Sequence, residues 1–177
     1  MLEILGIIFL ILIAVVIGLL VYASTKPDVV SYARSAQINA PPEKILALIT
    51  DFKKWGAWSP WEKKDPALQR TYSGAPNGAG AVYAWDGDKN VGSGRMEIIE
   101  ATPTKVRIKL DFFKPFKASN VAASTCTPKN GATHLDWVMT GQNLFIGKVM
   151  SLFIDMDKMI GKDFEAGLAD MKAAAES

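Results

Sequence analysis

Histidine and cysteine are the scarcest residues of this 177-residue chain, and each occurs only once, as His134 and Cys126. A single cysteine excludes an intrachain disulfide and any metal site built from several cysteines. A single histidine excludes the multi-histidine sites that often hold catalytic zinc. No loop has the carboxylate spacing of a calcium site. We therefore expect no metal and no cofactor, and the cellular compartment is left open.

An excess of charge of one sign is also lacking. The formal net charge is +2, and residues 24–177 hold all 20 basic residues and every acidic residue except Glu3. Proteins that bind nucleic acids gather Lys and Arg on one face or in one segment. No such cluster occurs in this sequence. The composition therefore predicts no nucleic-acid partner.

Charged residues are missing altogether from residues 4–23, ILGIIFLILIAVVIGLLVYA. At about 1.5 Å per residue, ~20 helical residues span roughly 30 Å, the thickness of the hydrocarbon core of a bilayer. Tyr22 stands at the end of the run, where interfacial aromatic residues are common. We predict a single-pass transmembrane anchor over residues 1–24, which contacts the membrane through residues 4–23, and a linker over residues 25–30.

A cleaved signal peptide is the alternative for this segment, because Val21, Tyr22 and Ala23 before Ser24 fit a small-residue cleavage site loosely. A signal peptide normally has a positive start and a shorter apolar core, and neither is present. Basic residues follow the run and none precedes it, which favours a cytoplasmic domain. These few residues leave the side of the membrane open.

A catalytic set is not recognisable in the remaining sequence. Alternation along its predicted strand places His134 beside Asp136 on the polar face, and no third partner for nucleophilic catalysis is evident. Asp155 and Asp157 point in different directions on the predicted helix and are expected to be solvated. The segment GAPNGAG, residues 74–80, lacks the Lys and Ser/Thr of a phosphate loop and is interpreted as a turn between strands.

The order of the predicted elements is one strand, one helix, six strands and one long helix. The first strand covers residues 29–40, and Pro41, Pro42 and Glu43 suit the start of the helix that follows. Turn residues separate the later strands, which favours antiparallel pairing. These six strands are predicted at residues 68–74, 81–85, 94–101, 105–113, 118–127 and 133–141.

Apolar periodicity indicates which surfaces face each other. Residues 105–112 and 134–140 alternate between apolar and polar side chains, which is typical of strands with one covered face. Between Asn143 and Ala174, apolar residues recur at steps of three and four, which predicts one long helix across the sheet. Gly147, Gly161 and Gly167 lie within this segment. Because an interior glycine costs about 1 kcal/mol relative to alanine, we expect these glycines to permit close approach to the sheet or to a ligand.

The stretch WGAWSPWEKKDP, residues 55–66, contains three of the five tryptophans. Pro60 and Pro66 favour extended conformations of the residues before them, so an extended crossing segment is predicted over residues 58–66. Three exposed indoles would be an aggregation hazard. We consider three explanations for them: the tryptophans close the core, they form a lid over an apolar cavity, or they form a membrane-facing belt.

The chain resembles the helix-grip (SRPBCC, or START-like) superfamily, which includes START lipid-transfer domains, polyketide cyclases and the birch-pollen-allergen type. Four stretches carry the resemblance, and the bacterial polyketide cyclase/dehydrase-like group is the most similar. The resemblance implies an α+β fold over residues 31–175, in which a curved antiparallel sheet grips a long C-terminal helix around an apolar cavity. The four stretches are INAPPEKILALITDFKKWGAWSPW, TYSGAPNGAGAVYAW, ATHLDWVM and MIGKDFEAGLADMK.

The resemblance implies binding of a hydrophobic small molecule or lipid, and together with the anchor expected from residues 4–23 it predicts a membrane-tethered binding module. A polyketide cyclase/dehydrase-type enzyme and a regulatory or structural domain with a protein partner are the alternatives. Arg95, Tyr83 and Asp86 are candidate polar groups inside the cavity, but no catalytic residue is assigned. The predicted cavity residues are Trp55, Trp58, Trp61, Tyr83, Trp85, Met96, Phe112, Trp137, Phe153 and Met156.

Overall fold

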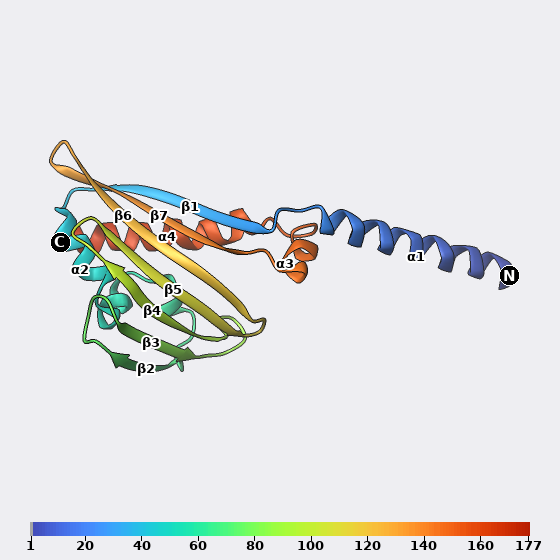
Figure 1. Cartoon of the computed structure of the whole chain (residues 1–177), viewed down its shortest axis with the longest axis horizontal. Helices are drawn as coiled ribbons and strands as arrows, with labels where there is room; N and C mark the ends of the chain where they lie inside the picture. The colour runs from blue at the N-terminus through green and yellow to red at the C-terminus, as the bar shows by residue number, and fades with distance from the viewer. Residues whose placement is uncertain (1) are drawn as a thin grey trace.

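A computed structural model describes residues 2–177 (Figure 1). Helix α1 (Leu2–Ser24) projects from one end of a domain that contains one sheet and three further α-helices. Seven antiparallel strands form this sheet in the order β1-β7-β6-β5-β4-β3-β2. The strands are β1 (Val29–Ile38), β2 (Gln69–Gly74), β3 (Ala81–Asp86), β4 (Ser93–Ala101), β5 (Lys105–Lys114), β6 (Ala118–Lys129) and β7 (Ala132–Gln142).

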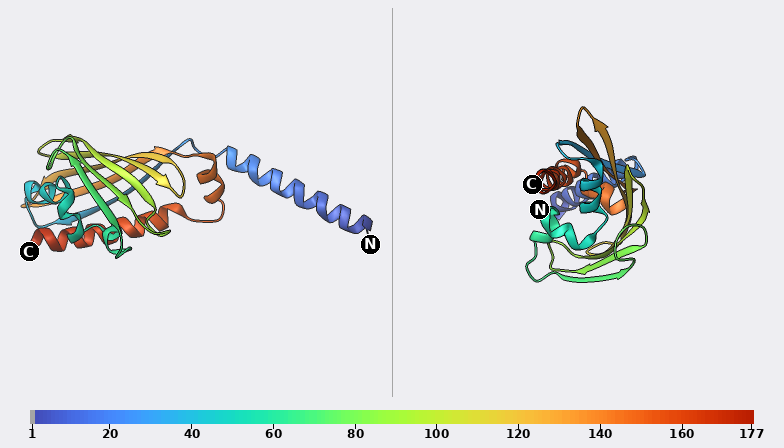
Figure 2. Two further views of the ribbon diagram at one scale, coloured as in Figure 1. Left: turned by 90° about the horizontal axis from the view of Figure 1, so that it is seen from below. Right: turned by 90° about the vertical axis from the view of Figure 1, so that its left-hand side faces the viewer.

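The sheet curves around the C-terminal helix α4 (Met156–Glu176), which lies on its concave side (Figure 2). Helix α2 (Pro42–Ile49) and the 3₁₀ helices η1 (Phe52–Ala57) and η2 (Pro60–Lys63) lie between β1 and β2 in the chain and close the end of the domain that is remote from α1. This arrangement confirms the predicted α+β helix-grip fold. Helix α2 begins at Pro42, as Pro41 and Pro42 indicated.

The long C-terminal helix is present, but its predicted continuity from Asn143 to Ala174 is wrong, because this segment forms two helices. Helix α3 (Phe145–Met150) is followed by a turn, and α4 begins only at Met156. The carboxylate of Asp155 accepts a hydrogen bond from the backbone N–H of Lys158 and caps α4. Aspartate at this position satisfies an amide that has no partner within the helix. The cap therefore starts a new helix where the apolar pattern alone suggested continuity.

The prediction of an extended segment over residues 58–66 is also wrong in its centre. Ser59 is extended, as expected before a proline, with φ −74° and ψ 121°. Pro60 then occupies the first position of η2, where its missing N–H costs nothing because the first amides of a helix lack internal partners. Residues 58–66 therefore contain the short 3₁₀ helix η2, which follows the end of η1 after only Trp58 and Ser59.

Glycines on α4 allow the close approach to the sheet that the sequence indicated. A Cβ on Gly161 would lie 1.8 Å from a guanidinium nitrogen of Arg34 on β1. A Cβ on Gly167 would lie 3.0 Å from the indole of Trp137 on β7. Gly147 differs, since its nearest neighbour is the side chain of Asn143, at 2.9 Å, in its own segment. Two of the three glycines thus lie at the contact between α4 and the sheet.

Candidate functional site: an apolar cavity

A cavity of about 570 Å³ lies between the concave face of the sheet and the helices. Alternate residues of β5 and β6 form its floor, because successive side chains of a strand point to opposite faces. Ile108, Leu110 and Phe112 line it from β5. Ala122 and Ser124 line it from β6. The face that the alternation of residues 105–112 predicted to be covered is therefore the wall of a cavity.

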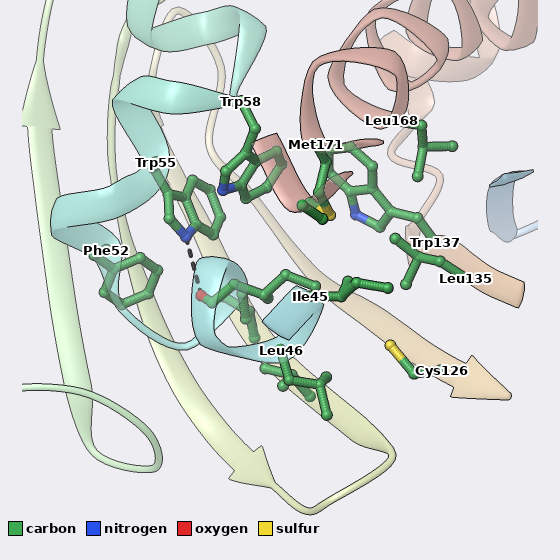
Figure 3. Packing of buried hydrophobic residues seen from close by; sticks show 14 of the residues in the cluster. Ile45, Leu46, Phe52, Trp55, Trp58, Cys126, Leu135, Trp137, Leu168 and Met171 are labelled. Carbon is green, nitrogen blue, oxygen red and sulfur yellow. Dashed lines mark hydrogen bonds between the residues drawn. The ribbon is translucent and has the colours of Figure 1, made fainter. Parts of the chain in front are cut away.

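The tryptophan-rich segment contributes Trp55, Trp58 and Trp61 to the cavity wall, and Figure 3 shows Trp55 and Trp58 packed among other buried hydrophobic residues. Trp55 donates its indole N–H to the carbonyl of Ile49 at 3.0 Å, and Trp58 donates to the carbonyl of Leu48 at 3.1 Å. These carbonyls belong to the last turn of α2, where helix carbonyls lack internal partners. The two indoles are thus fixed by the end of α2.

Both of these indoles are core residues and cavity-wall residues at once. Trp55 and Trp58 are 6% and 2% exposed, belong to the main hydrophobic cluster and also line the cavity. For Trp55 and Trp58, the position in the core and the position in the cavity wall are therefore compatible. The membrane-belt explanation is wrong for both, because their side chains are buried inside the domain.

A second aromatic group joins the sheet to α4 at the cavity. The rings of Trp137 and Phe164 are stacked, with centroids 4.2 Å apart and an interplanar angle of 4°. Trp61 from η2 meets both rings edge-on, at 6.0 Å from Trp137 and 6.2 Å from Phe164. Aromatic pairs in such geometries contribute about 0.5–1.5 kcal/mol beyond their buried area. This group holds η2, β7 and α4 in fixed positions around the cavity.

A polar part of the cavity wall is a network centred on Glu62, which the sequence analysis did not identify. The hydroxyl of Tyr83 donates to one carboxylate oxygen of Glu62 at 2.6 Å, and Nε of Arg70 donates to the other at 2.6 Å. Burial, followed by the hydrogen bond to Glu62, raises the pKa of Tyr83 above its ordinary value. Both carboxylate oxygens of Glu62 thus accept hydrogen bonds, which fixes this side chain between Tyr83 and Arg70.

The other candidate polar residues lie outside the cavity lining. Arg95 pairs with Glu97 at 2.8 Å, and Asp86 pairs with Lys114 at 3.6 Å. Of the three candidates, only Tyr83 lines the cavity. The only signal for Glu62 in the sequence is its position next to Trp61. Its hydrogen bond with Tyr83 of β3 arises only when the chain folds.

The predicted cavity residues reach the lining with one exception. Trp55, Trp58, Trp61, Tyr83, Trp85, Met96, Phe112, Trp137 and Met156 all line the cavity. Phe153 does not, because it lies in the turn between α3 and α4 and its side chain is 72% exposed. Contact of these residues with a ligand stays a prediction.

His134 lies beside Asp136, as predicted, with 3.3 Å between Nε2 and a carboxylate oxygen. Both side chains are more than a third exposed and neither lines the cavity. Within residues 2–177, no group of three or more His, Cys, Asp or Glu side chains is arranged to hold a metal ion. This surface pair therefore has no geometric link to the cavity.

Solved structures with this fold include protein CV1439 from Chromobacterium violaceum, which has a TM-score of 0.58 and 14% identity and matches over 86% of this chain and 99% of its own. The di-domain ARO/CYC protein StfQ of the steffimycin biosynthetic pathway matches at TM-score 0.62 and 15% identity, over 84% of this chain and 51% of its own. Ara h 8.0201 matches at TM-score 0.55 and 13% identity, over 83% of this chain and 97% of its own.

No curated protein sequence matches this chain significantly. A family model described as "Polyketide cyclase / dehydrase and lipid transport" matches residues 29–176, which is the whole domain that follows α1 and its linker. With the helix-grip fold and the cavity between its sheet and helices, this match shows that the chain belongs to the polyketide cyclase/dehydrase and lipid transport family.

Proposed function

We propose that this protein is a membrane-tethered binding module for a hydrophobic small molecule or lipid. The cavity of about 570 Å³ carries the proposal. Its volume falls within the roughly 300–1,000 Å³ of typical small-molecule sites, which are mostly apolar with a few placed polar groups. Aromatic and aliphatic side chains dominate the wall, and the Glu62–Tyr83 pair supplies a polar contact within it. This chemistry suits a ligand with a large apolar body and one hydrogen-bonding group.

Helix α1 supports the tether. Its residues 3–24 are long and apolar enough to cross a membrane, and the domain buries none of the most apolar part of the helix. A helix that is apolar on every side is stable only in a core or in a bilayer. Ala23, the last residue before the alternative cleavage site, is fully buried, and α1 packs against α3 at this end. These contacts favour a retained anchor over a cleaved signal peptide.

Family membership supports the ligand class. The family description names lipid transport together with cyclase and dehydrase activity. The domain of this chain shares its fold with two di-domain ARO/CYC proteins of biosynthetic pathways, StfQ and BexL. An enzyme that acts on a polyketide-like substrate is therefore the second candidate, and the Glu62–Tyr83 pair in the cavity wall is the observation in its favour.

Native mass spectrometry of the full chain, released from lipid nanodiscs, tests the binding proposal. Ala122 points into the cavity and Ala123, its neighbour on β6, does not. A Trp at residue 122 fills the cavity, whereas a Trp at residue 123 places the same bulk on the other face of the sheet. We expect an apolar adduct on the wild type and on Ala123→Trp, and its loss from Ala122→Trp.

The paired variants separate cavity ligands from lipids that merely surround α1, because α1 is identical in all three proteins. An adduct that survives Ala122→Trp would contradict the proposal, as would a wild-type chain that stays empty in a lipid extract. Turnover of a polyketide-like substrate that is lost in Tyr83→Phe, with adduct binding intact, would favour the enzyme instead.

A further inference from the structure

The end of the domain nearest α1 carries a group of exposed apolar side chains. We call it the apolar rim and define it as Phe116, Leu144, Phe145, Ile146, Phe153 and Ile154. Each of these side chains is at least 41% exposed, and Phe153 reaches 72%. Six large apolar residues gathered at one end of a domain usually mark an interaction surface rather than ordinary solvent-exposed surface.

Strand register places the parts of this rim at one end. Phe112 pairs with Ala118, so the turn that holds Phe116 lies where β5 ends and β6 begins. Asn120 pairs with Gly141, and Gln142 pairs with Val29. The ends of β5 and β7 and the beginnings of β6 and β1 therefore meet at the same edge, next to α3 and to the junction with α1 (Figure 1).

The cavity reaches this same end. Its lining includes exposed residues of the rim, namely Phe116, Leu144 and Ile146, together with exposed Lys117 and Met159. Its deep wall is the Trp55–Trp58 pair, next to Trp137. Trp137 precedes Gln142 by five residues on β7, which is about 17 Å at ~3.4 Å per residue. The cavity is thus a channel that runs along the strands from the tryptophans to the rim.

The short linker keeps the rim close to the end of α1. Only four residues, 25–28, separate α1 from β1. Fully extended, they span at most about 14 Å, and contacts between α1 and α3 shorten the separation further. Lys26 folds back over the ring of Tyr22 at 4.7 Å, which suits a cation and an aromatic residue at the headgroup level.

We infer that the rim inserts into the leaflet from which α1 emerges, and that the cavity takes up its ligand directly from the acyl-chain region of the bilayer. This inference rests on the proposed tethered binding function and adds the route of entry. A bilayer is the occupant that the geometry favours, because the anchor, the rim and the exposed cavity residues lie at one end. An apolar ligand that enters at this end need not cross water. As the ligand moves from the bilayer into the cavity, contacts with the rim side chains replace its contacts with lipid.

Quenching by lipids tests the docking of the rim. The full chain carries Cys126→Ala and one environment-sensitive fluorophore, at Phe153→Cys on the rim or at Ile99→Cys, an exposed apolar control on β4 remote from α1. Reconstitution uses phosphatidylcholine–phosphatidylglycerol vesicles that contain nitroxide groups on the acyl chains. We expect a blue shift and loss of most of the fluorescence at residue 153, with little change at residue 99. Equal, weak quenching at both positions overturns the inference, as does crosslinking of two copies of the chain through their rims.

Loading of a photoreactive probe tests the route of entry. A phosphatidylcholine with a diazirine on its acyl chain is placed in the same bilayer, and crosslinks to β5, β6 and β7 are mapped over time. The double variant Phe116→Asp/Phe153→Asp should load about tenfold more slowly than wild type, which corresponds to an activation barrier for loading that is ~1.4 kcal/mol higher. Ile99→Asp should load at the wild-type rate.

The two readouts separate failure of this inference from failure of the proposed function. Wild-type loading that the rim variant leaves unchanged overturns the entry route while the binding function stands. A wild type that shows quenching at residue 153 but never crosslinks inside the cavity overturns the binding function and the entry route together, and leaves the docked rim as a membrane contact only.

Discussion

Arg34 of β1 occupies the space that a side chain on Gly161 of α4 would need. Its Nη2 donates to the carboxylate of Asp157 at 2.9 Å and its Nε donates to Glu165 at 2.8 Å. A Cβ on Gly161 would lie 1.8 Å from that Nη2. The glycine therefore allows one guanidinium to join β1 to two carboxylates on α4. The Asp157 side chain is 58% exposed, as expected for a residue on a solvated face, and its hydrogen bond from Arg34 lowers the pKa of its carboxyl below the ordinary value.

Gly161→Ala should leave the free energy of unfolding within about 1 kcal/mol of wild type. Alanine gains about 1 kcal/mol of helix propensity, and this gain is offset in part because the displaced Arg34 loses its ion pairs to two half-exposed carboxylates. In an Arg34→Ala background nothing is displaced, so the same change should stabilise by about 1 kcal/mol. Urea unfolding of the four proteins, followed by tryptophan fluorescence, measures the coupling, and purely additive effects would contradict the account.

Gly167→Ala changes another glycine of α4, but this substitution should lower the free energy of unfolding. A Cβ there would lie 3.0 Å from the Trp137 ring and 3.2 Å from Pro60. Trp137 is stacked on Phe164, so neither neighbour can move away as a flexible side chain can. Forced overpacking costs about 1–3 kcal/mol, and we expect a net loss of stability in the same unfolding experiment. A gain in stability would mean that the aromatic group is loosely packed.

Tyr83→Phe should destabilise the domain by about 1–3 kcal/mol, because it leaves one oxygen of Glu62 without its donor in a largely buried site. Tyr72 is the matched control. Its ring stacks on Tyr83 with centroids 5.2 Å apart, and no hydrogen bond from its hydroxyl is found within residues 2–177. Tyr72→Phe should change the stability by no more than about 0.5 kcal/mol. Equal effects of the two substitutions, measured by urea unfolding, would argue against the Glu62 network.

The fold could be predicted from sequence wherever burial imposes a regular pattern. Strands β5 and β7 alternate because one face covers the cavity or core and the other meets solvent, and Pro42 marks the start of α2. The break before α4 was missed because the apolar pattern continues through Leu152 and Phe153. Only the Asp155 cap signals the break, and a single capping residue is weak evidence against a long periodic stripe.

The sequence predicted the aromatic wall of the cavity, but it did not predict the polar residue Glu62 or the open end of the cavity at the apolar rim. Trp58 and Trp137 have large apolar side chains, which are expected inside the domain whether they pack in the core or line the cavity. Glu62 becomes a cavity residue only because η2 folds against β3, which local pattern does not encode. Phe153 was misplaced because the prediction assumed that an apolar residue in a helical stripe is buried, whereas here it belongs to the exposed rim.

Cys126 should be inert in the folded protein. Its side chain is 1% exposed, and burial raises the pKa of its thiol to about 11. Because the thiolate is the reactive form, a disulfide reagent at pH 8 should modify the native chain far more slowly than the urea-unfolded chain. Reaction of native protein at the unfolded rate would contradict the burial. The raised pKa also means that the unfolded chain loses this proton first, so the contribution of Cys126 to stability should fall as the pH rises from about 9 to 11.

The contact between Lys148 of α3 and Asp28 of the linker should make the attachment of α3 sensitive to acid. Lys148 is 8% exposed, while the Asp28 side chain with which it pairs is 93% exposed. The hydrogen bond and the charge of Lys148 lower the pKa of Asp28 below its ordinary value of 3.8. A lowered carboxyl pKa contributes stability that is present above the ordinary pKa and is lost as the pH falls through the lowered one.

Asp28→Asn should therefore speed hydrogen exchange of the α3 amides at neutral pH and remove the change that wild type shows below about pH 4. Lys148→Met is the matched variant, because it replaces the buried ammonium by an apolar side chain of similar length, an exchange that is often neutral or stabilising. It should keep α3 protected and should also remove the acid dependence. If exchange in Lys148→Met accelerates as much as in Asp28→Asn, the pair attaches α3 by packing of the lysine side chain rather than by charge. An acid response that persists in both variants would assign the titration to another carboxylate at this end of the domain.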